Sequence, residues 1–323
     1  MARLPRRPLL AVPTLGLWPT PAHAQPGFPS RPVRVIIPFG PGGGTDNLIR
    51  AIEPVVSRLL GRPLVVENRP GGGGMIGTEL VARAEPDGYT LLANEQTFVI
   101  NPSLFPNLPY DTLRDFAPVQ ILANAPIVLI VSAGFPAQTL PELIALVRSR
   151  PGAFSYASGG NGSTVHLAAE MLKLSAGLEI THLPYRGSGP AMNDIVAGHV
   201  PMGMNGLSAA GPHIRDGRVR ALAVTGPTRS AAFPDIPTFQ ELGVSVEIYT
   251  HWGVATRAGT PAPIIARLAE AFGAAVRAPE LAERLAAMGY VPNGQGPEAY
   301  GRVIAEELER FGRVIRAANI RPD

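Results

Sequence analysis

Two glycine-rich turns are the parts of this chain best suited to hold a ligand. Residues 38–46 read PFGPGGGTD and residues 157–164 read ASGGNGST, and each turn follows an apolar run typical of a strand. Glycine lets the backbone approach a ligand closely, and the helix start beyond each turn offers unpaired N–H groups at the positive end of its dipole. Two such turns, placed in different lobes by the pattern, predict a small anion held from both sides.

The first turn presents mainly backbone donors. Its predicted ligand contacts are the backbone at Gly42, the N–H groups of Gly43, Gly44 and Thr45, and the ring of Phe39 as an apolar wall. Thr45 also has the residue type of an N-cap. Asp46 allows two interpretations: it accepts N–H bonds at the helix start, or it orients water or a ligand hydroxyl. An ordinary strand-to-helix turn, with glycine used for positive φ, is the alternative for the whole segment.

The second turn adds side chains that form hydrogen bonds. Its predicted ligand contacts are Ser158, Gly160, Asn161, Gly162, Ser163, Thr164 and His166. The alternative role of Ser163 and Thr164 is N-capping of the helix that follows. His166 lies one turn into that helix, where a packing histidine is the favoured interpretation.

Two further strand ends supply three candidate side chains. Tyr185 and Arg186 follow a strand predicted at residues 180–183, and Arg186 either pairs with a carboxylate or is an ordinary solvated arginine. Asn205 follows a strand predicted at residues 200–204 and either points into the ligand cleft or is a turn asparagine.

The elements that must position these residues alternate between strands and helices. A strand at residues 33–38 and a helix at residues 45–60 begin this series, which is typical of a parallel sheet with crossover helices. The rhythm changes at residues 119–131, where two apolar runs lie close together. A first lobe of residues 25–122 and 248–323, an inserted lobe of residues 123–247, and hinge crossings near 119–127 and 243–252 are therefore predicted. The ligand cleft is expected between the lobes.

Composition and the N-terminus limit the class of protein. The chain has 323 residues, a hydrophobic content of 46% and no cysteine, which suits two globular domains without disulfides or thiolate metal sites. Residues 1–24 have the features of a signal peptide, with Arg3, Arg6 and Arg7 before an apolar stretch and an AHA cleavage signal. We therefore expect export to the periplasm, with cleavage between Ala24 and Gln25.

The charge pattern argues against a nucleic-acid partner. The net charge of +3 comes from the signal-peptide arginines, which leaves 25 basic and 25 acidic residues in the exported part. The remaining arginines are scattered, whereas a nucleic-acid surface needs clustered positive charge.

Motifs for catalysis and cofactors are weak or missing. Residues 72–77 match G-x-G-x-x-G, but the dinucleotide motif begins directly at a strand end, and here Arg69 and Pro70 intervene. G-x-S-x-G and H-E-x-x-H are absent, and the histidines are dispersed. We therefore expect no catalytic residue, no metal and no cofactor. An exported α/β enzyme that binds a nucleotide at residues 72–77 is the alternative.

A series of stretches along nearly the whole exported chain resembles the periplasmic solute-binding receptors of tripartite tricarboxylate transporters, the Bug or TctC-type family. They are residues 35–46 (VIIPFGPGGGTD), 65–71 (VVENRPG), 86–92 (PDGYTLL), 101–104 (NPSL), 108–111 (LPYD), 156–166 (YASGGNGSTVH), 184–187 (PYRG), 212–214 (PHI) and 220–225 (RALAVT). The resemblance implies a two-lobed α/β fold of the type II periplasmic-binding-protein class. It also implies a small carboxylate held between the two glycine-rich turns, lobe closure on binding, and delivery to a permease of one large and one small subunit.

Departures from the family pattern bear on the ligand. Family members often carry Asp-Asn where this chain has Asn205 and Gly206. An aspartate at this position would suit the ammonium group of an amino acid. We therefore expect a di- or tricarboxylate or an aromatic acid in preference to an amino acid. Residues 95–97 (EQT) replace a small uncharged stretch, which adds Gln96 and Thr97 to the predicted pocket. We expect a monomer. A receptor that presents its ligand to a sensor instead of a permease fits the same sequence.

Overall fold

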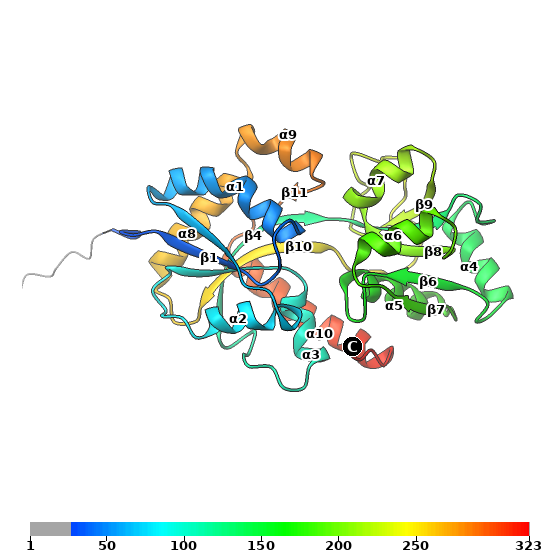
Figure 1. Ribbon diagram of the computed structural model, residues 1–323, viewed down its shortest axis with the longest axis horizontal. Helices are drawn as coiled ribbons and strands as arrows, with labels where there is room; N and C mark the ends of the chain where they lie inside the picture. The colour runs from blue at the N-terminus through cyan, green and yellow to red at the C-terminus, as the bar shows by residue number, and fades with distance from the viewer. Residues whose placement is uncertain (1–26, 323) are drawn as a thin grey trace, which may run out of the picture.

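The computed structural model describes residues 27–322, and in it the chain forms two α/β lobes that lie side by side (Figure 1). The predicted signal peptide lies outside the described residues. Each lobe is built on one sheet, and the chain passes from the first lobe to the second and back, so the first lobe contains both early and late segments. The exact residue limits of the lobes stay a prediction.

The first lobe contains a six-stranded sheet with the order β11-β4-β10-β3-β1-β2. Its strands are β1 (Val33–Ile37), β2 (Leu64–Asn68), β3 (Thr90–Asn94), β4 (Phe116–Ala125), β10 (Thr250–Arg257) and β11 (Val291–Pro292). Its helices are α1 (Gly44–Leu60), the 3-10 helix η1 (Gly72–Gly74), α2 (Met75–Ala82), α3 (Thr97–Leu104), α8 (Ala262–Val276), α9 (Pro279–Ala287) and α10 (Pro297–Ala317). The predicted parallel pairing holds for β2, β1 and β3, whereas β10 runs antiparallel between β3 and β4.

The second lobe contains a five-stranded sheet with the order β7-β6-β8-β5-β9. Its strands are β5 (Ile127–Ser132), β6 (Ser155–Ser158), β7 (Thr181–Pro184), β8 (Met202–Gly206) and β9 (Val219–Val224). Its helices are α4 (Leu140–Ser149), α5 (Thr164–Ala176), α6 (Ser188–Val196) and α7 (Leu207–Arg215). Helices α3 and α7 and strand β11 have no counterpart in the sequence-based prediction, because they are short and lie beside stronger patterns.

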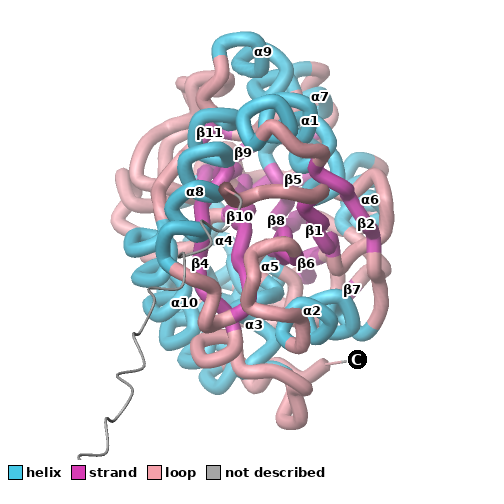
Figure 2. The backbone as a smooth tube through the Cα atoms, turned by 90° about the vertical axis from the view of Figure 1, so that its left-hand side faces the viewer, coloured by secondary structure: helices cyan, strands magenta, loops and turns pink. Residues whose placement is uncertain are grey.

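Alternation along β1 explains how the first sheet is covered on both faces. Val35 and Ile37 belong to a buried cluster with residues of α1 and α8, and Ile36 belongs to another with residues of α3 and α10. Figure 2 shows the strands between these helices. Val35, Ile36 and Ile37 are each fully buried, which is worth about 1.5–3 kcal/mol relative to exposure. The strand that precedes the first glycine-rich turn is therefore firmly anchored.

Helix α1 begins and ends at glycines. Its C-cap is Gly61, in the left-handed conformation with φ 70°, which glycine adopts without strain. At the other end the prediction of Thr45 as N-cap is wrong: the N-cap is Gly43, and Thr45 lies inside the first turn with its side chain buried. A buried Thr45 is turned toward the core and is not available to cap the helix.

Candidate functional site

Strand direction brings the predicted site residues to the gap between the lobes. Strands β1 and β3 run parallel, so the first turn and the β3–α3 loop lie at one sheet edge. The chain leaves the first lobe at this edge, where β4 ends at Ala125. It returns at the same edge, because Thr250 at the start of β10 pairs with Ala125. In the second sheet β6, β7 and β8 are parallel, and Ile127, where the chain enters, pairs with Gly206 at the end of β8. The carboxyl ends of both sets of strands therefore face the crossings (Figure 1).

The first turn leaves helix-start amides open. No side chain caps Gly43, and within residues 27–322 no acceptor faces the N–H groups of Gly44 and Thr45. These donors lie at the N-terminus of a helix of 17 residues. Open amides at the positive end of a helix dipole are suited to a carboxylate.

Asp46 holds the first turn together. Its side chain is 4% exposed and accepts hydrogen bonds from the Gly42 N–H at 2.9 Å, from Arg50 Nε at 2.9 Å and from Asn68 Nδ2 at 3.0 Å. Burial by itself raises the pKa of Asp46, but these hydrogen bonds outweigh burial and hold the pKa below its usual value. Of the two interpretations of Asp46, the geometry therefore favours hydrogen bonding to the helix start. The Gly42 N–H is already donated to it.

Aromatic side chains form the floor and wall of the first turn. Tyr290 donates its hydroxyl to the Gly44 carbonyl at 2.7 Å, and its ring meets Trp252 edge-on at 4.9 Å. Trp252 lies so close to Gly44 that a Cβ there would be 3.0 Å from its ring. Phe39 packs over Gly74 in the same way, with its ring 3.3 Å from where a Cβ would be. The sequence predicted Phe39 as a wall, but nothing in it marks Trp252 or Tyr290.

The glycines of residues 72–77 serve packing. Gly77 lies on α2 against the first turn, where a Cβ would be 2.7 Å from Pro38 Cα and 2.8 Å from the Arg69 carbonyl oxygen. Gly72, Gly73 and Gly74 all have positive φ in the short helix η1. This geometry accounts for the motif without a nucleotide.

The second turn uses several of its own amides internally. The Gly160 N–H donates to Ser158 Oγ at 3.1 Å, and the Gly162 N–H donates to His166 Nδ1 at 3.0 Å. Ser163 is the N-cap of α5 and accepts the His166 N–H, and Thr164 is the first residue of that helix. The Gly160 and Gly162 amides are therefore already donated within the turn, although the sequence predicts that both turns offer amides to a ligand.

His166 packs inside the second lobe, as its favoured interpretation predicts. It is buried and stacks on His182 with ring centroids 3.8 Å apart. Burial, with help from His182 and Lys173, lowers the pKa of His166 to about 3, so the ring is neutral at pH 7. A neutral Nδ1 is what the Gly162 N–H requires of its acceptor.

Three candidates at the other strand ends differ in their surroundings. Tyr185 donates a hydrogen bond from its hydroxyl to Asp194 at 2.5 Å. Asn205 lies within β8, not after it as predicted, and is buried. Its Nδ2 donates to the Ser188 carbonyl at 3.2 Å. Arg186 is exposed, and no hydrogen bond or ion pair engages it in the described part of the chain. Arg186 is thus the candidate whose charge is free for a ligand.

The β3–α3 loop touches the chain crossings. Gln96 is fully buried, and its Nε2 donates to the Tyr249 carbonyl at 2.7 Å and lies 2.8 Å from His251 Nδ1. Thr97 begins α3, which ends at Leu104 against the second turn: a Cβ on Gly162 would be 2.4 Å from Leu104 Cδ2. The second turn therefore contacts the first lobe directly, across the gap in which the ligand is predicted.

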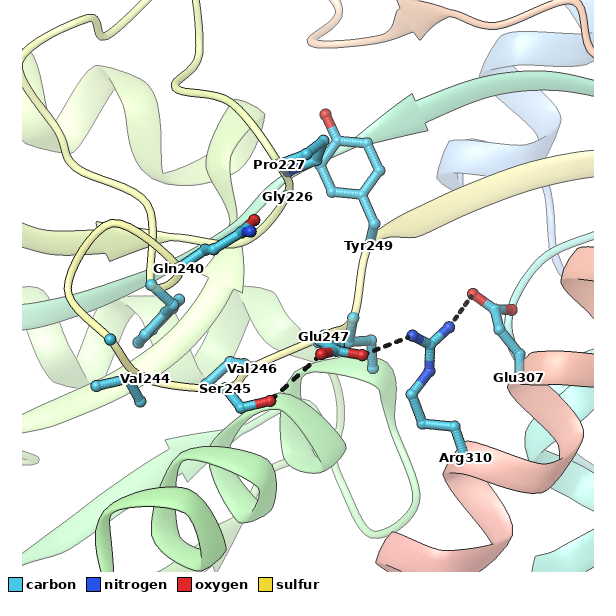
Figure 3. A pocket seen from close by; sticks show the side chains of 13 residues that line it. Gly226, Pro227, Gln240, Val244, Ser245, Val246, Glu247, Tyr249, Glu307 and Arg310 are labelled. Carbon is cyan, nitrogen blue, oxygen red and sulfur yellow. Dashed lines mark hydrogen bonds and ion pairs between the residues drawn. The ribbon is translucent and has the colours of Figure 1, made fainter.

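A cavity lies elsewhere, beside the second crossing (Figure 3). It measures about 490 Å³ and lies between residues 239–249, Gly226, Pro227 and two side chains of α10, Glu307 and Arg310. None of the predicted ligand contacts lines it. Its lining overlaps residues 243–252, so the cavity borders the segment that the sequence predicts as a hinge.

The lobes and strand edges together define a two-lobed periplasmic-binding-protein architecture. A sequence model of the tripartite tricarboxylate transporter family receptor, TctC, matches residues 48–320. The protein BugT of Bordetella pertussis is 37% identical over 292 residues, which are 90% of each chain. This chain therefore belongs to the TctC receptor family, as the sequence indicates.

Solved structures agree with this assignment. A Rhodopseudomonas palustris protein solved with adipate is 33% identical with a TM-score of 0.78, covering 92% of this chain and 100% of that one. MatC of the same organism, solved with bound malate, is 32% identical with a TM-score of 0.75, covering 89% and 100%. Among residues 27–322 no helix has the length and apolar character needed to cross a membrane.

Proposed function

We propose that this chain captures a small carboxylate in the periplasm and passes it to the permease of a tripartite tricarboxylate transporter. The observation that carries the proposal is the first turn, where open amides at the start of α1 face the gap between the lobes. Relatives solved with adipate and with malate support the same ligand class. Cleavage of the signal peptide after Ala24 and a permease of one large and one small subunit are parts of this proposal.

Asn205 supports a ligand without an ammonium group. It is buried at the carboxyl edge of the second sheet and carries no charge. A carboxylate at this position would be a natural partner for the ammonium group of an amino acid. We infer that a di- or tricarboxylate or an aromatic acid is the preferred cargo.

Binding energies indicate that the lobes close on the ligand. Micromolar affinity requires about −8 kcal/mol, whereas a helix N-terminus contributes at most about 2 kcal/mol. The first turn alone is therefore insufficient. Further hydrogen bonds, such as those of Arg186, and burial of the ligand between the lobes supply the remainder.

A ligand panel tests the function. The purified protein without its first 24 residues is heated with di- and tricarboxylates, aromatic acids, amino acids, NAD or ATP. We expect a carboxylate to raise the melting temperature. Stabilisation by a nucleotide alone would favour the exported-enzyme alternative.

Trp252 provides an independent signal. The chain has two tryptophans, and Trp18 lies in the predicted signal peptide, so Trp252 beside Gly44 is the only one left after cleavage. The ligand that raises the melting temperature should also change its fluorescence. In Trp252→Phe the fluorescence change should vanish, while calorimetry still detects binding.

A further inference from the structure

Helix α10 holds the second crossing at two points. Arg310 Nη1 lies 3.3 Å from Glu247 Oε2, on the segment that returns from the second lobe (Figure 3). Glu307, one turn earlier on the same helix, places Oε2 3.4 Å from His251 Nδ1, just after the crossing. Since α10 packs against β4 and α3 of the first lobe and also against α5 of the second, it is a third connection between the lobes.

The predicted binding edge holds the same crossing from the other side. Gln96 Nε2 lies 2.8 Å from His251 Nδ1 and donates to the Tyr249 carbonyl. One ring nitrogen of His251 therefore faces both the β3–α3 loop and α10. Gln96, His251 and Glu307 are all buried, where an unmet hydrogen bond is costly.

The two neighbours of His251 Nδ1 require opposite protonation states. An unprotonated Nδ1 accepts the Gln96 N–H and offers nothing to Glu307, whereas a protonated Nδ1 donates to Glu307 and repels the Gln96 N–H. Both neighbours lie within reach of Nδ1, and Glu307 Oε2 and Gln96 Oε1 are buried without a hydrogen-bond partner in the described part of the chain. The unpartnered Glu307 oxygen therefore gives Nδ1 a second partner, which a proton on that nitrogen would satisfy.

We propose that Gln96, His251 and Glu307 are positioning residues that form a hydrogen-bond switch between the ligand-binding edge and the hinge. With Nδ1 unprotonated, His251 holds the β3–α3 loop. With the proton on Nδ1, His251 binds α10 and releases that loop. The proposal rests on the proposed function, because it takes lobe closure on a carboxylate as the movement that the switch follows.

The hinge has room for this movement. The cavity of about 490 Å³ lies directly beside residues 244–249. The Glu247 side chain is 68% exposed, so its ion pair with Arg310 can break and re-form as the crossing shifts. Tyr300 on α10 and Glu95 in the β3–α3 loop also lie near His251, and Arg310 lies 3.9 Å from Glu307 Oε1, so the tests are made at one fixed pH.

Two leucine substitutions lock the switch in opposite states. In Gln96→Leu, Nδ1 has Glu307 as its remaining partner, and in Glu307→Leu it has Gln96. Each variant should bind the carboxylate about fivefold more weakly or worse, because one of the two arrangements is lost. The double variant should be no weaker than the poorer single variant, since both changes act on the same nitrogen. Glu309→Leu, on the exposed side of α10 and 74% exposed, is the matched control and should leave affinity unchanged.

Nitrogen NMR of the His251 ring distinguishes a switch from a purely structural contact. The Nδ1 shift should indicate protonated nitrogen in Gln96→Leu, unprotonated nitrogen in Glu307→Leu, and an intermediate or exchanging signal in the wild type. The same tautomer in all three proteins would overturn the proposal.

Unfolding of the ligand-free protein keeps this inference separate from the proposed function. The effects of the two substitutions on the free energy of unfolding should be non-additive. Additive effects would refute the switch even if a carboxylate binds. Non-additive effects with no binding of any carboxylate would leave the switch standing and overturn the proposed function.

Discussion

At the scale of single residues, the first turn separates the groups that hold the backbone from those left open to a ligand. Asp46 accepts a hydrogen bond from the Gly42 N–H, and Tyr290 donates one to the Gly44 carbonyl. The amides of Gly44 and Thr45 meet no acceptor among the described residues. A ligand site needs both a fixed backbone and open donors, because open donors bind tightly only when the backbone that carries them is already held in place.

Replacing Asp46 should destabilise the protein in a pH-dependent way. Asp46→Asn removes a charge-assisted hydrogen bond and should lower the free energy of unfolding at pH 7 by about 1–2 kcal/mol. Because its pKa is lowered in the folded state, the contribution of Asp46 is fully present above the ordinary pKa of about 4. It is lost as the pH falls through the lowered value.

Urea unfolding at several pH values measures this effect. Asp216→Asn breaks an exposed ion pair with Arg218 and should change stability by less than about 1 kcal/mol at any pH. An Asp46→Asn defect that stayed constant down to the acid limit would show that packing, not charge, explains the role of Asp46.

At the scale of elements, the turns depend on how closely helices approach strands. Helix α2 lies against the first turn at Gly77, and α3 reaches the second turn through Leu104. Both contacts join segments that are distant in the sequence. The turns are therefore placed by packing as well as by the strands that lead into them.

A methyl group at Gly77 should disturb the first turn. Gly77→Ala puts a Cβ against Pro38 and the Arg69 carbonyl, both backbone atoms that cannot rotate away. We expect a loss of about 1–3 kcal/mol in unfolding free energy, together with weaker carboxylate binding. Thermal and urea unfolding measure the first effect, and calorimetry the second.

Gly134→Ala is the matched control for this substitution. A Cβ at Gly134 meets no atom within 4 Å, so stability should change by less than about 0.5 kcal/mol. Equal effects of the two substitutions would mean that close approach is not the reason for glycine at position 77.

At the scale of the whole molecule, the lobes are joined by two backbone crossings and by α10. The crossings lie between β4 and β5 and before β10, and α10 packs on both lobes (Figure 1). Such a joint favours rotation of two rigid lobes over local unfolding. The cavity beside residues 243–249 borders the second crossing, where we expect that rotation to be accommodated.

Solution scattering should detect this rotation. The radius of gyration of the protein without its first 24 residues should decrease when the stabilising carboxylate is added to saturation. NAD at the same concentration is the control and should leave the radius unchanged. An unchanged radius at saturating carboxylate would argue against closure and against delivery by a closing receptor.

The sequence by itself determined the features that depend on local patterns. Residues 33–38 form a short apolar run and residues 45–60 repeat with the period of a helix, so the strand at 33–37, the helix at 44–60 and the turn between them were predictable within a residue. That the second turn also offers amides to a ligand remains a prediction. It did not anticipate His166 and Ser158 as internal acceptors, because nothing in the local pattern tells which acceptor an amide will find.

Only the tertiary structure decided the features that join distant residues. Gln96 meets Tyr249 and His251 more than 150 positions away, and Trp252 and Tyr290 support Gly44 from late in the chain. Such contacts leave no periodic trace, because they arise from the geometry of two packed sheets and not from neighbouring residues. The same geometry determines the position of the cavity beside residues 243–249. It also determines that α10 contacts both lobes.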